Sequence, residues 1–133
     1  MEKLVVFVPG RLGNPLNGPH GHWSKHARWA KQWRERTHLA WLEKYQRRGD
    51  LVPTVPKLIR FRAHTWNAVD DDALSAMCKP VRDALRDIGL IHDDSPGSGH
   101  VFVYGQVIER SHRGVQITVE PLESTVADSG LGQ

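Results

Sequence analysis

The sequence predicts a single α/β domain of the α+β type, in which helices pack on a small mixed sheet in the order β-α-β-α-β-β. Short runs of β-branched and aromatic residues are interspersed with two long stretches whose apolar residues recur at helical spacing. The chain of 133 residues is long enough for one hydrophobic core and too short for two ordinary domains. We expect this domain to occupy residues 1–122 and the polar residues 123–133 to form a disordered tail.

The first part of the chain predicts a strand, a loop and one long helix. Residues 3–9 are mostly apolar and β-branched, which predicts a strand, and residues 10–21 contain the Gly, Asn and Pro typical of a loop. Residues 22–47 contain no Pro or Gly and predict a helix. Its apolar side consists of Trp29, Ala30, Trp33, Thr37, Ala40 and Trp41. We interpret this side as packing on the sheet rather than as a base-stacking platform.

The middle of the chain predicts a second strand and a second helix. Residues 57–64 alternate between apolar and polar side chains, as a half-buried strand does. Residues 71–88 predict a helix, and Gly89 is suited to end it. Because proline fits best in the first turn of a helix, Pro80 predicts either a kink or a second helical piece that begins there.

Two further strands are predicted near the end of the chain, at residues 100–108 and 114–120. Both are rich in β-branched residues, and only residues 109–113 separate them. A link this short is typical of a hairpin, so we expect the two strands to pair with each other.

The composition excludes several classes of protein. Apolar residues make up 39% and charged residues 25% of the chain, which is typical of a globular protein. No apolar run is long enough to cross a membrane, and the N-terminal segment lacks the pattern of a signal peptide. A single cysteine, Cys78, rules out an internal disulfide and a cysteine-based zinc site. We therefore expect a cytoplasmic protein with no membrane partner.

The charges are distributed unevenly along the chain. Residues 11–62 contain twelve Lys and Arg against three acidic residues, whereas residues 68–96 contain seven Asp against three Lys and Arg. This pattern indicates a surface for a polyanion beside a site for a cation. A solvated basic helix with ordinary acidic turns remains the alternative.

Three successive carboxylates, Asp70, Asp71 and Asp72, precede or begin the second predicted helix. Their mutual repulsion is costly unless a cation offsets it. On extended backbone, Asp70 and Asp72 would point the same way, and Mg²⁺ commonly uses one or two carboxylates together with water and phosphate. An acidic helix N-terminus with an Asp cap explains one of the three equally well.

A second acidic pair, Asp93-Asp94, follows the helix in a loop, and a returning loop can bring Asp94 towards Asp70. Lys79 lies two helical turns after Asp72 and is expected on the same face of the helix. The complete pattern is Asp70-Asp71-Asp72-Ala73-Leu74, Lys79, Asp83-Ala84-Leu85, Ile88-Gly89-Leu90 and Asp93-Asp94.

Over about residues 55–121, this pattern resembles the RusA family of Holliday-junction resolvases. The family core is a D-x-D-N-L element, a helical Lys, a D-A-L or D-G-L, and a Gly before a loop that ends in D-D. The resemblance implies that Asp70, Asp72 and Asp94 bind Mg²⁺, for which Mn²⁺ substitutes, and that Lys79 is catalytic. Ala73 stands where the family has Asn, and the gap between Asp72 and Lys79 matches only the longer-spaced members.

The resemblance also implies a function. The expected activity is Mg²⁺-dependent, structure-selective endonuclease cleavage of four-way DNA junctions in recombination and repair, by a homodimer in a bacterial or phage-infected cell. The residues expected to contact DNA phosphates are Lys25, Arg28, Lys31, Arg60 and Arg62. Two alternatives remain open, namely a related nuclease for other branched or nicked DNA and a non-catalytic nucleic-acid-binding module.

Overall fold

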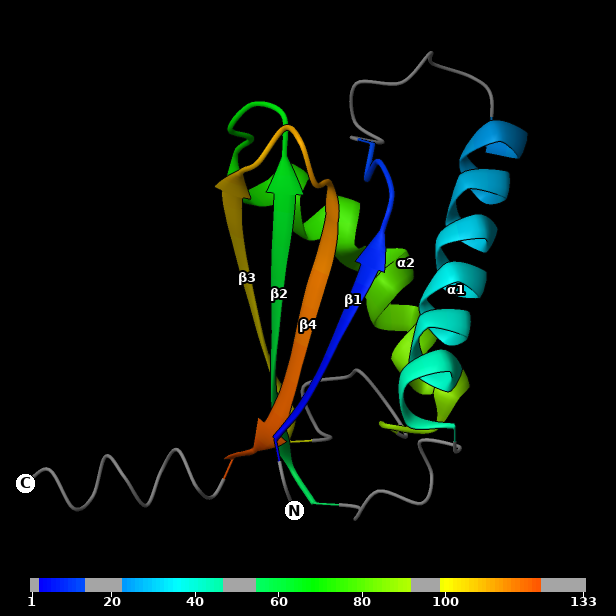
Figure 1. Cartoon of the computed structure of the whole chain (residues 1–133), viewed down its shortest axis with the longest axis vertical. Helices are drawn as coiled ribbons and strands as arrows, with labels where there is room; N and C mark the ends of the chain where they lie inside the picture. Colours follow the sequence, from blue (N-terminus) through cyan, green and yellow to red (C-terminus); the bar gives the residue numbers. More distant parts are fainter. Residues whose placement is uncertain (1–2, 14–22, 47–54, 92–98, 123–133) are drawn as a thin grey trace, which may run out of the picture.

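The computed structural model of the chain describes residues 3–13, 23–46, 55–91 and 99–122, with the side chains of the first helix described from His26 onward (Figure 1). Its elements are β1 (Leu4–Pro9), α1 (Trp23–Tyr45), β2 (Lys57–Thr65), α2 (Asp71–Ile88), β3 (Val101–Ile108) and β4 (Gly114–Pro121). This order confirms the predicted β-α-β-α-β-β arrangement. The proposed tail, residues 123–133, lies outside the described residues.

The four strands form one mixed sheet in the order β1-β4-β2-β3. Strand β2 pairs in parallel with β3 and antiparallel with β4, and β4 pairs antiparallel with β1. Strands β1, β2 and β3 therefore run in the same direction, as their arrowheads in Figure 1 show. Their carboxyl ends all lie at one end of the sheet, and the loops that follow them share that end.

The predicted hairpin of the last two strands is wrong, because β2 lies between β3 and β4. Three residues of β2 on the helix side, Ile59, Phe61 and Ala63, are almost completely buried, and a central position gives this strand a neighbour on both sides. Residues 109–113 cross the end of β2, a distance of about 10 Å for two strand spacings. A five-residue link spans about 16 Å when extended, so it is long enough to skip a strand.

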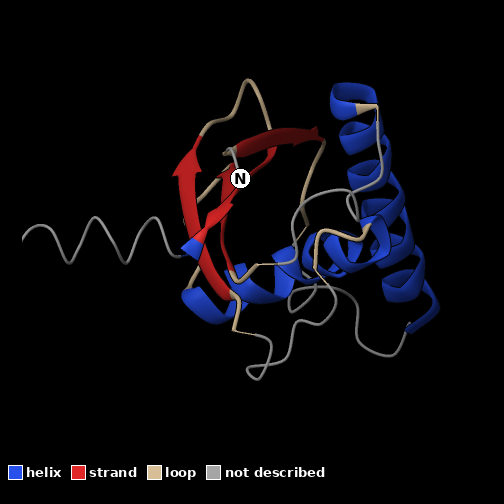
Figure 2. Ribbon diagram, turned by 90° about the horizontal axis from the view of Figure 1, so that it is seen from below, coloured by secondary structure: helices blue, strands red, loops and turns tan. Residues whose placement is uncertain are grey.

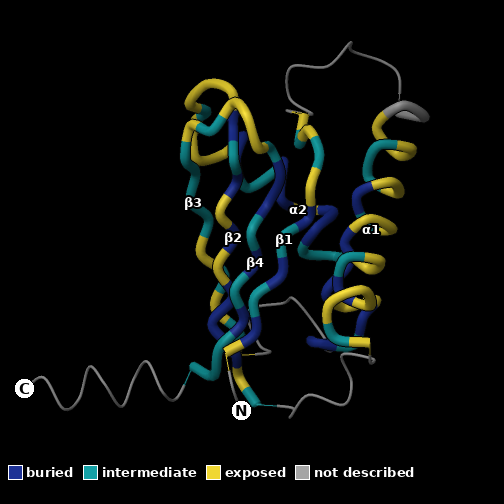
Figure 3. Tube along the Cα trace, viewed as in Figure 1, coloured by how far each residue is buried: buried dark blue, intermediate teal, exposed yellow. Residues whose placement is uncertain are grey.

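Both helices lie on one side of the sheet (Figure 2). Buried residues alternate with more exposed ones along the central strands (Figure 3). Ile59 of β2 and Ile117 of β4, for example, are completely buried. Trp33 and Trp41 of α1 are each only 1% exposed and belong to the same core. The interpretation of the apolar side of α1 as a packing surface is therefore confirmed for these two tryptophans.

Helix α2 continues through Pro80 as a single helix, so of the two expected outcomes, a kink or a second helical piece, the second is wrong. Proline removes one backbone hydrogen bond from the helix interior. The flanking residues Met77, Val81 and Leu85 are buried in the core, and this packing holds the helix together across the missing bond. The predicted C-cap is confirmed, since Gly89 has φ 96° and its N–H bonds the carbonyls of the last turn.

The free edge of β1 is covered by the end of α1. The hydroxyl group of Tyr45 accepts a hydrogen bond from Val5 N at 2.9 Å and donates one to Val5 O at 3.0 Å, and Lys44 Nζ also reaches Val5 O. These bonds satisfy backbone groups that an edge strand otherwise leaves open.

Neither described helix is long and apolar enough to cross a lipid bilayer.

Candidate active site at the carboxyl ends of the parallel strands

Three loops meet at the carboxyl ends of β1, β2 and β3. The loop after β1 bonds the loop after β3 through Gly10 N and Arg113 O at 3.1 Å. Glu109 N, just after β3, donates to Thr65 O at the end of β2 at 2.9 Å. In open α/β sheets, ligands bind outside the carboxyl ends of parallel strands. The segment with the three aspartates follows β2 and therefore lies where this rule places a ligand site.

The connection from β2 to α2 is fixed by Gln106 of β3. Its side-chain oxygen accepts from Val69 N at 2.9 Å, and its side-chain nitrogen donates to Val69 O at 2.7 Å. These two bonds hold the residue immediately before Asp70. Sequence reasoning did not single out Gln106. The available signal is a long polar side chain among the apolar residues of β3, on the side that faces the helices.

Asp70 is the N-cap of α2. Its backbone is extended, with φ −73° and ψ 167°, and its Oδ1 accepts from Ala73 N at 2.7 Å. The alternative that one of the three aspartates caps the N-terminus of the helix is therefore confirmed for Asp70. The other oxygen, Oδ2, accepts no hydrogen bond from any described residue and remains available to a cation.

Asp71 and Asp72 form the first turn of α2, where the helix dipole favours negative charge. The expectation that Asp70 and Asp72 both lie on extended backbone is wrong for Asp72, which is helical. Both first-turn carboxylates are exposed, and neither bonds another described residue. Because no described residue bonds these two carboxylates, solvent and the helix dipole stabilise their negative charges.

The donor set fits a hard divalent cation. Asp70 Oδ2 and the carboxylate of Asp72 are hard oxygen ligands, and Mg²⁺ is commonly held by one or two carboxylates together with water and phosphate. Within residues 3–13, 23–46, 55–91 and 99–122, no three His, Cys, Asp or Glu side chains form a metal-binding group. The predicted third ligand, Asp94, lies outside the described residues.

Lys79 is exposed on α2, and its Nζ bonds Asp83 Oδ2 at 3.2 Å. Asp83 follows Lys79 by one turn, so the ammonium group is directed away from Asp72, which lies about 10 Å back along the helix axis. Asp83, the first residue of the Asp83-Ala84-Leu85 element of the pattern, is the partner of Lys79. The Lys79 side chain is 61% exposed and that of Asp83 only 15%, so this ion pair lies at the border between solvent and the packed side of α2.

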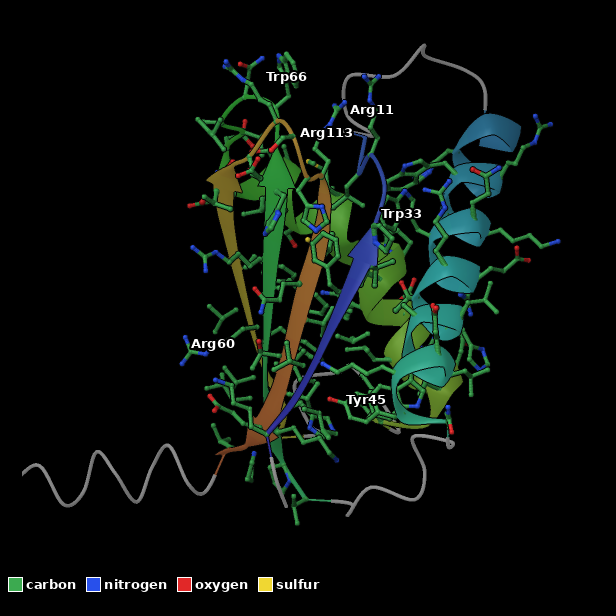
Figure 4. The ribbon with its side chains drawn as sticks, in the orientation of Figure 1. Arg11, Trp33, Tyr45, Arg60, Trp66 and Arg113 are labelled. Carbon is green, nitrogen blue, oxygen red and sulfur yellow. The ribbon has the colours of Figure 1, made fainter. Side chains whose placement is uncertain are left out.

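The five predicted DNA-contacting residues lie on different sides of the molecule. Arg28 and Lys31 are exposed on α1, and Lys25 lies in the first turns of that helix, where its side chain is not described. Arg60 and Arg62 project from the sheet face opposite the helices, as Figure 4 shows for Arg60. The two groups would therefore contact different segments of a nucleic acid.

Two of these basic residues already have acidic neighbours. Arg60 Nε lies 3.6 Å from Glu120 Oε1, and Lys31 Nζ lies 4.0 Å from Glu35 Oε1. Arg28 and Arg62 have no acidic partner among the described residues. Exposed ion pairs are weak, so all four remain available to phosphates, and Arg28 and Arg62 need break no ion pair to bind them.

The structure also rules out a thiol nucleophile. Cys78 is buried in α2, and burial raises the pKa of its thiol to about 12, so the thiolate is scarce at neutral pH. The chemistry available at the carboxyl ends of the parallel strands is that of exposed carboxylates beside arginines.

Neither a comparison with models of known protein families nor a search of curated proteins finds a match for this chain.

Proposed function

We propose that this protein is a Mg²⁺-dependent, structure-selective endonuclease that resolves four-way DNA junctions, as its resemblance to the RusA family implies. One observation carries the proposal most strongly. An exposed Asp72 and the unused oxygen of Asp70 lie at the carboxyl end of a parallel strand pair, where such folds bind ligands. A structural role accounts for the cap formed by Asp70, and the helix dipole favours a first-turn carboxylate, but neither requires three successive carboxylates that repel one another.

The residues have distinct roles in this proposal. Asp70 and Asp72 would hold the Mg²⁺, with Asp94 as the expected third ligand. Bound Mg²⁺ supplies charge neutralisation at the scissile phosphate and lowers the pKa of a water molecule. Gln106 fixes Val69 and thereby the position of Asp70. Lys79 would leave Asp83 and place its positive charge on the phosphate, where charge develops during cleavage.

DNA binding in this proposal is largely electrostatic. Arg28 and Lys31 on α1 would contact one junction arm, and Arg62 on the opposite face of the sheet would contact another. Contacts of this kind give affinity that depends on salt and little on sequence. Selectivity for a junction would then come from the angle between arms that meet two faces of the protein at once.

Resolution of a junction needs two incisions, so we propose a homodimer with one site in each subunit. Light scattering at micromolar concentration should report about twice the chain mass of 15.0 kDa. A monomer that makes paired, symmetric incisions would contradict this part of the proposal.

The direct test uses a mobile four-way junction and a linear duplex of matched sequence, each with and without Mg²⁺. We expect Mg²⁺-dependent incision of the junction and none of the duplex. Incision of flaps or nicked duplexes in preference to junctions would favour a nuclease for other branched DNA. Tight junction binding without incision at any Mg²⁺ or Mn²⁺ concentration would favour the non-catalytic binding module, which the capping role of Asp70 also accommodates.

A further inference from the structure

Trp66 is the most unusual aromatic residue among the described side chains. It immediately follows β2 and is 50% exposed, whereas Trp33 and Trp41 are almost completely buried. Two arginines from the loop after β3 lie against its ring. The Cζ atoms of Arg110 and Arg113 are 5.1 and 5.2 Å from the ring centroid.

Hydrogen bonds hold this group in place. Arg110 Nε donates to Trp66 O at 3.1 Å, and Arg110 also reaches Asn67 Oδ1 at 3.5 Å. The backbone bond between Arg113 O and Gly10 N ties the same loop to β1. Trp66, Arg110 and Arg113, which we call the Trp66 group, are thus positioned by the two strand-end loops rather than by a buried core.

A cavity of about 360 Å³ opens beside the Trp66 group. Its walls include Arg11, His64, Trp66, Asn67 and Arg113, and Figure 4 shows Arg11, Trp66 and Arg113 at the same end of the molecule. The volume lies at the lower end of the range for small-molecule sites. The cavity continues to Ala68 and Val69, which lead directly to Asp70.

The charges that line the cavity favour an anion. Arg11 and Arg113 have no acidic partner among the described residues. The nearest carboxylate in the loop after β3 is Glu109, whose Oε1 is bonded by Ser111 N at 3.0 Å. The hydrogen bond from the Ser111 hydroxyl, together with the bond from Ser111 N, holds the pKa of Glu109 below its usual value, so Glu109 is ionised at neutral pH. The residues that line the cavity include Arg11 and Arg113 and no acidic residue, so the cavity itself is positive, while the carboxylates of Asp70, Asp71 and Asp72 lie just beyond Val69.

An exposed indole flanked by guanidinium groups in a positive cavity matches one ligand chemistry closely. Unpaired nucleobases stack on aromatic rings and on arginine planes, while the adjoining phosphates bind positive charge. A fully paired duplex does not offer a free base face. The Trp66 group would therefore discriminate by the availability of an unstacked base rather than by sequence.

We propose that the Trp66 group is a stacking site for an unpaired base at the branch point of the DNA substrate, with Arg11 on an adjoining phosphate. This inference rests on the proposed function, which it deepens by naming what is recognised next to the carboxylates. Trp66 lies four residues before Asp70, at most about 13 Å along the chain. A base held by Trp66 would place a neighbouring phosphate of its strand beside Asp70 and Asp72.

The test measures stacking without cleavage. A four-way junction and a linear duplex each carry 2-aminopurine, at the branch point and at the matched duplex position, and are bound in buffer without divalent metal. We expect the wild-type protein to change the 2-aminopurine fluorescence of the junction only. Trp66→Ala should abolish this change and weaken junction binding by about tenfold, the effect of losing one stacked base. Trp66→Phe should retain most of both signals.

Leu39→Ala is the matched control, because Leu39 is an apolar residue on α1 that is 65% exposed, and α1 contributes no residue to the cavity beside the Trp66 group. It should leave binding and fluorescence unchanged. Unchanged fluorescence with the wild-type protein, or equal junction affinity of Trp66→Ala and wild type, would overturn the stacking site even if Mg²⁺-dependent cleavage is observed. A Trp66-dependent fluorescence change without cleavage under any metal would instead uphold the stacking site and refute the nuclease.

Discussion

Substitution of Asp70 separates its capping role from its proposed metal-binding role. Asp70 Oδ1 accepts the bond from Ala73 N that caps α2. Asparagine caps helices about as well as aspartate, whereas alanine costs about 1 kcal/mol at this position. Asp70→Asn therefore preserves the cap and removes the carboxylate, and Asp70→Ala removes both. We expect neither variant to cleave junctions and only Asp70→Ala to be clearly less stable.

The size of the stability change follows from the length of the chain. An unfolding entropy of roughly 2.1 cal/mol/K per residue gives about 0.28 kcal/mol/K for a domain of this size. The loss of about 1 kcal/mol then lowers the melting temperature of Asp70→Ala by about 4 °C. Asp70→Asn loses a favourable charge at the helix N-terminus but also relieves repulsion with Asp71 and Asp72, so its net change is small.

Thermal unfolding followed by circular dichroism, together with a single-turnover cleavage assay, measures both effects on the same preparations. An Asp70→Asn variant as unstable as Asp70→Ala would show that the cap depends on the negative charge. An Asp70→Asn variant that cleaves junctions at the wild-type rate would refute the metal-binding role, whatever its stability.

Three further predictions concern the surroundings of the site. Gln106→Leu keeps the side-chain volume but leaves Val69 N and Val69 O without their hydrogen-bond partners. We expect it to lower the free energy of unfolding, measured in urea, by about 2 kcal/mol and to slow junction cleavage. An unchanged cleavage rate would show that Gln106 does not position Asp70. Two hydrogen bonds from Arg34, at 2.8 and 2.7 Å, hold the pKa of Asp87 below its usual value. This exposed pair stabilises the fold above the ordinary carboxyl pKa of about 3.9 and loses its effect as the pH falls through the lowered pKa. Asp87→Asn should therefore cost up to about 1 kcal/mol at pH 7 and progressively less as the pH falls below about 4, and a cost that does not change with pH would contradict it. Finally, the double variant Lys25→Ala/Arg28→Ala should weaken binding to junctions of every sequence by the same factor. It should also flatten the slope of log affinity against log salt concentration by about one for each phosphate that the variant no longer neutralises. An unchanged slope would place α1 away from the DNA.

Much of the fold could be predicted because its signals are local. Helix α2 was predicted with its observed bounds, since Asp70 and Gly89 are residues that begin and end helices by their own backbone and side-chain chemistry. Strand pairing is not local. The separation of β3 and β4 by β2 depends on how all four strands pair within one sheet, and a five-residue link is compatible with either arrangement.

The candidate site was predictable only in part for the same reason. The spacing of Asp70 and Asp72 indicated a cation site, although the cap and the first helical turn give them a different geometry from the extended one expected. Gln106, Arg110 and Arg113 reach Val69 and Trp66 only because β2 and β3 pair in parallel with a specific register. Without that register, the sequence contains no sign that residues about 40 positions apart share one surface.

The most direct test of the central claim compares Asp72→Asn with Asp71→Asn. Both residues are exposed in the first turn of α2 and both substitutions remove one negative charge, but only Asp72 is a proposed metal ligand. Single-turnover cleavage of a four-way junction in Mg²⁺ is measured for each variant, and junction affinity is measured without metal. We predict that Asp72→Asn abolishes cleavage while binding stays equal or tightens, and that Asp71→Asn still cleaves. Cleavage by Asp72→Asn at the wild-type rate would contradict the proposed site.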